Sequence, residues 1–267
     1  MYLTLGRAEP APRMTTETPG SVSPLALVPD TTTDEFRAVC RVDTKMKSGR
    51  HSFGSGVLIT TRHVLTCAHV IFPPEEPNNT FSIHVFVAQN GPAAASNGIK
   101  ADGWAVKRGW SANCCRSWDE DYGIIRLSKD APTPFWPMPP FDPRCLMGKD
   151  AYLAGYPARE RDPQAQFMHR TRGPILGSMQ IASCTAGEIR PSRWPAIDDT
   201  TRLVEHRLDT AKAISGGPLW SVVDHRRILW GLHGGNFHGG ASKYAILLNK
   251  GVRAEIAHWV SHGLTGR

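Results

Sequence analysis

The run Ala213-Ile214-Ser215-Gly216-Gly217-Pro218 is the most informative stretch of this chain. It lies between two apolar segments, residues 203–208 and 219–223, and this pattern predicts a tight turn that joins two strands. Glycines directly after a serine allow the backbone to pass close to a substrate carbonyl. Ser215 is therefore a candidate nucleophile, although turns of this composition also occur in ordinary loops.

Two upstream residues would be suitable partners for this serine. His69 follows the expected strand 63–66, and Asp121 directly precedes the apolar run 122–127, which places it at the start of a strand. A serine hydroxyl needs a neighbouring base to become a good nucleophile at neutral pH, and histidine has a suitable pKa. An aspartate can hold that imidazole in the required tautomer. Asp121 is preferred over two adjacent carboxylates because the apolar run begins immediately after it; these are Asp119 and Glu120.

The order histidine, aspartate, serine resembles that of the chymotrypsin-like serine proteases. The stretch Gly54-Ser55-Gly56-Val57-Leu58-Ile59 upstream of the histidine adds to the resemblance, which covers roughly residues 30–262. It implies an all-β fold of two antiparallel six-stranded β-barrels with a C-terminal α-helix. It also implies a serine endopeptidase in which Ser215 is the nucleophile, His69 the general base and then acid, and Asp121 the group that orients the histidine.

Finer detail resembles the glutamyl endopeptidase branch of that family. The stretches that carry this likeness are Asp209-Thr210, Tyr152-Leu153-Ala154-Gly155-Tyr156-Pro157 and Trp230-Gly231-Leu232-His233-Gly234-Gly235. In that branch the residues matching Thr210 and His233 hold the carboxylate of a substrate glutamate. A hydroxyl and an imidazolium can both donate hydrogen bonds to it, and the charge-assisted one is the stronger. Gly234 and Gly235 would offer their backbone to an extended substrate. The resemblance therefore implies cleavage after glutamate.

Three alternatives remain open at this stage. Asp209 falls where trypsin-type enzymes carry the aspartate that binds arginine or lysine, so an Arg/Lys-specific protease is one of them. The family's oxyanion hole would use the backbone N–H groups of Ala213 and Ser215, but the glutamyl branch usually has glycine at the position of Ala213. A catalytically weak protease fold that serves as a binding module is therefore the second. The third is a basic adaptor for nucleic acid or acidic partners. Ile214 stands where trypsin-type zymogens need an aspartate, which excludes their activation by a new amino terminus.

Composition limits the partners that need to be considered. The chain has 267 residues, of which 40% are hydrophobic and 21% charged, as in ordinary globular proteins. The net charge of +7 comes from scattered residues without a nucleic-acid module, so a solvated basic face is expected. We expect a protein or peptide substrate, with neither a specific nucleic acid nor a membrane as partner, and no oligomeric state is assigned. The resemblance implies no cofactor.

The six cysteines show no Cys-x-x-Cys spacing, so no metal site is expected. They are predicted to be mostly free thiols, with a Cys40–Cys67 disulfide as the alternative for Cys67. The amino terminus lacks the apolar core of a secretory signal, and no 18-residue apolar stretch occurs. A cytoplasmic protein, or one exported by a route that needs no such signal, is therefore expected.

The chain divides into a leader and a protease domain. Residues 1–33 are rich in Pro, Thr and Ser and predict a flexible leader or pro-segment, and residues 34–267 form the domain. Within it we expect a first barrel at about 34–130, a Pro-rich linker at 131–143, a second barrel at about 144–248 and a C-terminal helix at 249–262. Asn249 is the predicted cap of that helix, because apolar residues then recur on one face. Separate strands are expected at 166–171 and 175–183.

Overall fold

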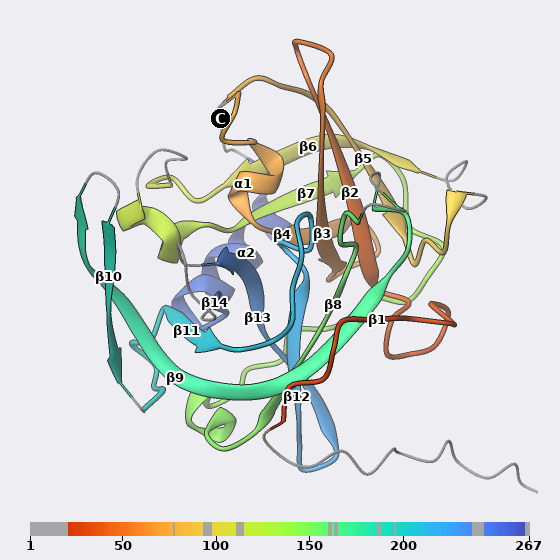
Figure 1. Ribbon diagram of the computed structural model, residues 1–267. Coiled ribbons are helices and arrows are strands. Elements are labelled where there is room, and N and C mark those ends of the chain that lie inside the picture. The colour runs from red at the N-terminus through yellow and green to blue at the C-terminus, as the bar shows by residue number, and fades with distance from the viewer. Residues whose placement is uncertain are drawn as a thin grey trace, which may run out of the picture.

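The fold is seen in a computed structural model. It describes residues 21–76, 78–92, 98–110, 115–159, 162, 165–185, 188–194, 196–236 and 243–264. Two β-barrels lie side by side, and a helix closes the chain (Figure 1). The predicted all-β fold of two six-stranded antiparallel barrels with a C-terminal helix is confirmed. Among the described residues, no helix is both long and apolar enough to cross a bilayer.

The first barrel closes through six antiparallel strands in the order β2-β3-β4-β7-β6-β5. Their side chains alternate between the barrel interior and its outside, and apolar residues such as Val42, Val57, Ile83 and Ile125 are fully buried. The strands are β2 (Val39–Met46), β3 (His51–Leu58), β4 (His63–Thr66), β5 (Thr80–Val87), β6 (Ile99–Val106) and β7 (Gly123–Leu127).

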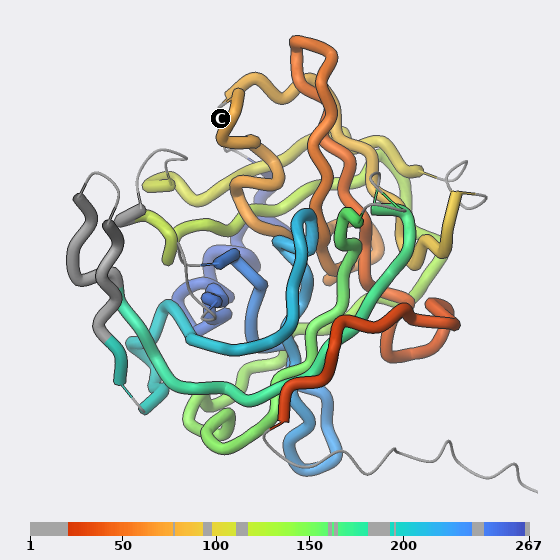
Figure 2. The backbone as a smooth tube through the Cα atoms, in the orientation of Figure 1, coloured from red at the N-terminus to blue at the C-terminus, as the bar shows by residue number. Residues whose placement is uncertain are grey.

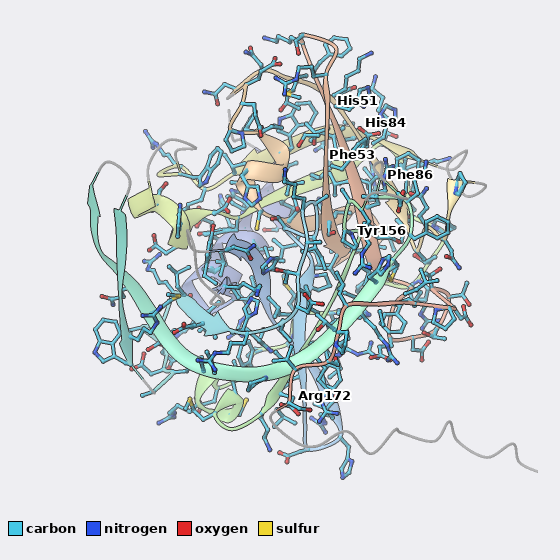
Figure 3. The ribbon with its side chains drawn as sticks, in the orientation of Figure 1. His51, Phe53, His84, Phe86, Tyr156 and Arg172 are labelled. Atoms are coloured by element: carbon cyan, nitrogen blue, oxygen red, sulfur yellow. The ribbon has the colours of Figure 1, made fainter. Side chains whose placement is uncertain are left out.

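The outside of this barrel carries a buried cation. The Arg41 guanidinium lies 4.7 Å from the ring centre of Phe53 and 4.9 Å from that of Phe86. Figure 3 shows these two rings on β3 and β5, the strands on either side of β2. Arg41 is only 3% exposed and lies 3.7 Å from Asp43. Because the aromatic faces and the carboxylate compensate for lost water, this arginine does not belong to a solvated basic face.

The second barrel closes through β8-β9-β11-β14-β13-β12, with β12 pairing back to β8. The strands are β8 (Asp150–Gly155), β9 (His169–Thr185), β11 (Leu203–His206), β12 (Pro218–Val223), β13 (Arg226–Asn236) and β14 (Lys243–Leu247). The strand β10 (Glu188–Trp194) pairs with β9 outside the ring. The two strands expected at 166–171 and 175–183 are one long strand, β9. The sequence Gly173-Pro174 suggests a break between two strands, but both residues pair with β8 and the strand continues through them.

The predicted leader is partly folded. Residues 1–20 lie outside the described residues, but β1 (Ala26–Leu27) pairs with β9 of the second barrel. Figure 2 follows this N-terminal segment, in red, along that strand. Leu25 is 7% exposed and Val28 is fully buried. A flexible segment as far as residue 33 is therefore wrong for this part, because its two apolar side chains and its backbone have partners on the second barrel.

The segment that joins the two barrels and the final helix both pack against them. No strand occurs between β7 and β8, and the linker packs Trp136 against Trp220 with ring centres 5.2 Å apart. The short 3-10 helix η3 (Pro143–Leu146) ends it. The helix α2 (Lys250–His262) is capped by Asn249, whose side chain accepts a hydrogen bond from the backbone N–H of Val252 at 3.0 Å. The buried face of α2 consists of Val252, Ile256 and Trp259.

Candidate active site

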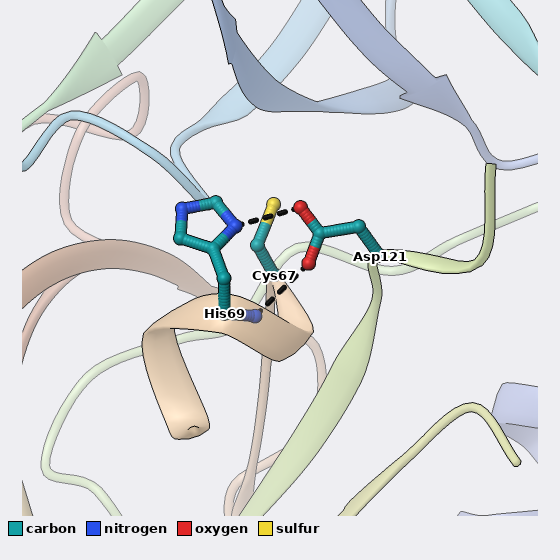
Figure 4. A group of neighbouring side chains, drawn as sticks. All are labelled: Cys67, His69 and Asp121. Carbon is teal, nitrogen blue, oxygen red and sulfur yellow. Dashed lines mark hydrogen bonds and ion pairs between the residues drawn. The ribbon is translucent and has the colours of Figure 1, made fainter. Parts of the chain in front are cut away.

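His69 and Asp121 meet at one end of the first barrel. His69 lies on the short helix α1 (Ala68–Ile71), directly after β4, and Asp121 lies between the 3-10 helix η2 (Cys115–Glu120) and β7. The His69 ring nitrogen Nδ1 is 2.6 Å from one Asp121 carboxylate oxygen, and the His69 backbone N–H donates to the other at 2.9 Å (Figure 4). The carboxylate thus fixes both the position and the tautomer of the imidazole.

Burial and charge act in opposite directions on His69. Burial by itself lowers the pKa of the imidazole, but the charge of Asp121, its hydrogen bond and a smaller contribution from Glu75 together raise the pKa above its ordinary value of 6.5. Asp121 is only 2% exposed, so little water screens it. The side chain of His69 remains 25% exposed, and Figure 4 shows its second nitrogen, Nε2, on the side of the ring away from Asp121. That nitrogen can exchange a proton with a substrate or a nucleophile.

Ser215 lies in a turn of the second barrel that contacts the first barrel. The N–H of Gly217 donates to the Ile214 carbonyl at 3.0 Å, and the N–H of Gly216 donates to the His233 carbonyl at 2.8 Å. The φ of Gly216 is +80°, and a Cβ there would lie 2.3 Å from the Ser55 carbonyl oxygen. Only glycine fits this position, because the φ is positive and the Ser55 carbonyl leaves no room for a Cβ.

The Ser215 hydroxyl points to the backbone rather than to the histidine. It donates to the Gly234 carbonyl at 3.2 Å, and among the described residues it makes no hydrogen bond to His69. Catalytic hydrogen bonds are often absent before substrate binds, so this rotamer does not argue against a nucleophilic role. A rotation about one side-chain bond is enough to change the direction of a serine hydroxyl.

Two backbone N–H groups beside Ser215 are available to a ligand. In the part of the chain that the structure describes, the N–H groups of Ala213 and Ser215 have no hydrogen-bond acceptor. Ala213 has a φ of +68°, a conformation that disfavours every residue except glycine. The Lys212 carbonyl accepts a hydrogen bond from Ala158, so the trans peptide points the Ala213 N–H the opposite way. The turn therefore has two backbone N–H groups without an acceptor, one on each side of the Ile214 α-carbon.

Cys67 is fully buried next to His69 and Asp121. Its Sγ lies 3.3 Å from the His233 carbonyl, and burial raises the pKa of this thiol well above its ordinary value. The ligand atoms of Cys67, His69 and Asp121 lie within 4.8 Å of one another, so this group could hold a soft cation.

The predicted free thiols are confirmed where they are described. Cys40, Cys67 and Cys145 are all free, which excludes the alternative Cys40–Cys67 disulfide. Cys114 lies outside the described residues, as do the side chains of Cys115 and Cys184.

His233 is buried and paired with a second histidine. Its Nδ1 lies 3.2 Å from Nε2 of His206, and the two residues are 2% and 0% exposed. The Leu208 N–H donates to His206 Nδ1 at 3.3 Å, which leaves the proton of a neutral His206 on Nε2. His206 then donates to His233, whose own proton is placed on Nε2. Burial lowers the pKa of His206 to about 3 and that of His233 well below 6.5, so both rings are neutral near pH 7. The expectation of an imidazolium at His233 is therefore wrong, because the ring is buried beside a second histidine.

The other predicted specificity residues lie nearby but in different surroundings. The Thr210 hydroxyl is 3.2 Å from the side-chain oxygen of Asn236, which follows Gly234 and Gly235 at the end of β13. A Cβ on Gly234 would overlap the Tyr244 ring, so that position requires glycine. Asp209 accepts a hydrogen bond at 2.8 Å from the backbone N–H of Leu25, in the segment that leads into β1. This carboxylate is thus engaged by the chain itself.

Two parts of the site have no clear signal in the sequence. Ser55 on β3 is fully buried and contacts the Ser215 turn, although in the sequence it is only a serine between two glycines. Tyr122, next to Asp121, donates to the Glu255 carboxylate of α2 at 2.5 Å. Both contacts join segments more than 130 residues apart in the chain, so a local pattern could not predict them.

The sequence matches the family model described as "Trypsin-like peptidase domain" over residues 54–228. No curated protein matches the chain. A solved Glu endopeptidase is similar to it with a TM-score of 0.65 and 15% identity, over 88% of this chain and 95% of that chain. The protease Anisep from Arthrobacter nicotinovorans gives a TM-score of 0.60 and 11% identity, over 86% and 95%. The thermostable serine protease AL20 gives 0.59 and 14%, over 82% and 94%. At these identities the likeness to the solved structures is one of fold.

Proposed function

The chain belongs to the trypsin-like peptidase family, and from this premise we propose that it is a serine endopeptidase in which Ser215, His69 and Asp121 act together. The observation that carries the proposal is the pair of hydrogen bonds from His69 to the buried Asp121 carboxylate. A histidine held in this way, with Nε2 free and a serine turn from the other barrel beside it, is suited to proton transfer during acyl transfer.

The proposed reaction has two stages. Ser215 Oγ turns from the Gly234 carbonyl, loses its proton to His69 Nε2 and attacks the scissile carbonyl carbon, forming a tetrahedral intermediate. Protonated His69 then gives that proton to the leaving amine, the C–N bond breaks, and an acyl-enzyme on Ser215 remains. Water repeats the sequence, with His69 again as base and then acid, and releases the acid product. Asp121 stays ionised and stabilises the imidazolium.

The oxyanion hole is assigned to the N–H groups of Ala213 and Ser215. Both lack an acceptor among the described residues, and both belong to peptides whose carbonyls are held on the opposite side, Lys212 by Ala158 and Ile214 by Gly217. Donors fixed in advance need little rearrangement when negative charge develops on the substrate oxygen. Losing one such donor from a protease of this type slows the reaction about 100- to 1000-fold.

Preference for glutamate before the scissile bond is the proposed specificity. The relay from Leu208 through His206 supports a neutral His233 whose Nε2 carries a proton, and this N–H can donate to a carboxylate. Thr210 supplies a hydroxyl from the neighbouring loop, and Gly234 and Gly235 supply backbone for an extended peptide. Arg/Lys specificity through Asp209 is less well supported, because the Leu25 N–H already uses that carboxylate.

Cleavage of a peptide library by the purified full-length chain tests the proposal, beside a Ser215→Ala variant. Cuts after glutamate that are lost in the variant would support both the catalytic residues and the pocket. Cuts after arginine or lysine would retain the catalytic residues and assign the pocket to Asp209. If a fluorophosphonate does not label Ser215 in folded protein, the proposed enzymatic activity is wrong. That result would favour a protease fold used as a binding module, an alternative that the positive φ of Ala213 suggests.

A further inference from the structure

Ser55 is a buried serine at the contact between the two barrels. It lies on β3 of the first barrel and is 0% exposed. Its hydroxyl donates to the Ala213 carbonyl at 3.1 Å and accepts the Tyr156 backbone N–H at 2.9 Å. Its own backbone N–H donates to the Ser215 carbonyl at 2.8 Å. A single residue of one barrel thus holds two carbonyl groups of the turn on the other barrel.

The two carbonyls that Ser55 holds lie on either side of Ile214. Their fixed directions restrict the backbone torsions of the turn, because each peptide group is planar. Ala213 needs such a restraint most, since its φ of +68° lies in the region that an alanine adopts only under constraint from its surroundings. The hydroxyl contact acts on the carbonyl of Ala213 itself.

The surroundings of the hydroxyl are closely packed. A Cβ added to Gly155 would lie 2.6 Å from Ser55 Oγ, and the Ser55 carbonyl accepts the Thr66 hydroxyl at 2.6 Å. The hydroxyl is therefore held between a donor directly after β8, the Tyr156 N–H, and an acceptor in the turn. Removing it would leave the Tyr156 N–H without this acceptor and the Ala213 carbonyl without this donor.

We propose that Ser55 is a positioning residue for the oxyanion hole: its hydroxyl holds Ala213 in the left-handed conformation that aims the Ala213 N–H at the substrate oxygen. The inference rests on the proposed function, since an oxyanion hole matters only if Ser215 acylates. Ser55 does not touch substrate and acts through Ala213. Its effect should therefore appear in the transition state more than in substrate binding.

The test compares Ser55→Ala in two backgrounds, the natural Ala213 and Ala213→Gly. Glycine adopts a positive φ without restraint, so it should make the hydroxyl less necessary. With Ala213 present, Ser55→Ala should lower kcat roughly 10- to 100-fold, which does not exceed the decrease expected when one oxyanion-hole donor is lost. KM should change less than about twofold. In the Ala213→Gly background the loss should shrink to within about threefold.

Ser221 offers a matched control in the second barrel. It is also 0% exposed, donates to a backbone carbonyl, that of Asp150, at 2.8 Å, and accepts an N–H, that of Trp230, at 3.0 Å. Ser221→Ala therefore also removes one donated and one accepted hydrogen bond, but the partners lie on β8 and β13 rather than in the Ser215 turn. It should lower the melting temperature as Ser55→Ala does, with kcat unchanged.

Three outcomes would overturn the inference. The first is that Ser55→Ala and Ser221→Ala have the same kcat. The second is that Ser55→Ala lowers kcat by the same factor with Ala213 and with Ala213→Gly. Wild-type protein that neither cleaves peptides nor reacts with a fluorophosphonate overturns the proposed function instead. Crystal structures of wild type and Ser55→Ala test whether the Ser55 hydroxyl holds Ala213 at positive φ. The third outcome that would refute the inference is an Ala213 that keeps its positive φ in Ser55→Ala.

Discussion

At the scale of single residues, Ala213 is where conformation and proposed chemistry conflict most directly. Its φ of +68° disfavours alanine, and its N–H is one of the two proposed oxyanion donors. Among the described residues, five other non-glycine residues also have positive φ; two of them are alanines, and Ala88, at +50°, serves as the comparison. Comparing substitutions at Ala213 and Ala88 therefore separates the effect of backbone strain on stability from an effect on catalysis.

Replacing Ala213 by glycine should raise the free energy of unfolding by about 1 kcal/mol, because glycine adopts this φ without steric conflict. Urea denaturation monitored by tryptophan fluorescence measures the change. Ala88→Gly is the control, and we expect a similar gain in stability without any change in kcat. A loss of stability in Ala213→Gly would show that the alanine is not strained there.

The pH profile should report the pKa of His69. Only the neutral imidazole can accept the Ser215 proton, so kcat/KM should rise with pH, with a midpoint above 6.5. Asp121→Asn should lower activity by about 10⁴-fold and move the midpoint to lower pH. Asp119→Asn, a change in the neighbouring carboxylate, should leave the midpoint where it is. A midpoint that does not move in Asp121→Asn would exclude the carboxylate as the cause of the raised pKa.

The same interaction affects stability with a definite sign. Because the folded pKa of His69 is raised, the native state binds its proton more tightly than the unfolded chain does. The contribution of the His69–Asp121 pair to the free energy of unfolding is therefore fully present below about pH 6.5. It is lost as the pH rises through the folded pKa. The buried His206 and His233 act in the opposite sense, since their pKa values are lowered and the native state loses stability below about pH 6.5.

The three candidate residues can be found from the sequence because each stands beside a simple local signal. His69 and Asp121 flank apolar strands, and the structure brings them within hydrogen-bond distance. Ser215 lies in a glycine turn, but its contact with the first barrel depends on Ser55, which is 160 positions away. The role of Ser55 arises only when the barrels meet, so no periodicity or composition could predict it.

At the scale of elements, β1 was the least predictable feature. Its composition, rich in proline and polar residues nearby, favours a flexible segment, yet it pairs with β9 and its neighbours Leu25 and Val28 are buried. The backbone of Leu25 also accepts a hydrogen bond from Arg159 at 3.1 Å. Two apolar side chains and three backbone contacts are enough to fold such a segment when a sheet edge is available.

Removing residues 1–33 should therefore destabilise the protein. A variant that begins at Asp34 loses the burial of Leu25 and Val28, and we expect its free energy of unfolding to fall by roughly 2–5 kcal/mol. A variant that begins at Ser21 keeps these contacts and is the control. Thermal unfolding of the two variants and the full chain measures the difference. Equal stability of the two shortened chains would mean that β1 contributes nothing to the fold.

At the scale of the whole molecule, the C-terminal helix stabilises the half of the site that lies on the first barrel. Glu255 of α2 accepts hydrogen bonds from the Tyr122 hydroxyl and from Lys107 at 2.8 Å, and Trp259 packs against the Tyr122 ring. Tyr122 directly follows Asp121 in the chain. The final helix is thus connected to the loop that carries Asp121.

Glu255→Gln should weaken this contact and lower the free energy of unfolding by about 1–2 kcal/mol, because the Tyr122 hydroxyl loses a charged acceptor. We also expect a several-fold decrease in kcat, since the Asp121 loop becomes less restrained. Lys107→Met is the comparison, because it removes only a partly exposed ion pair and should change both quantities little. If the two variants behave alike, the helix does not position Asp121 through Tyr122.

The junction between β3 and the Ser215 turn also limits how this chain can be recombined with its relatives. A chimera that takes one barrel from another protease inherits half of the contact between Ser55 and Ala213, and the other half must fit it. The two barrels can be exchanged as modules only if positions 55 and 213 travel together. In such chimeras, the unit that must be exchanged together is the pair of residues in contact across the two barrels, rather than a whole barrel.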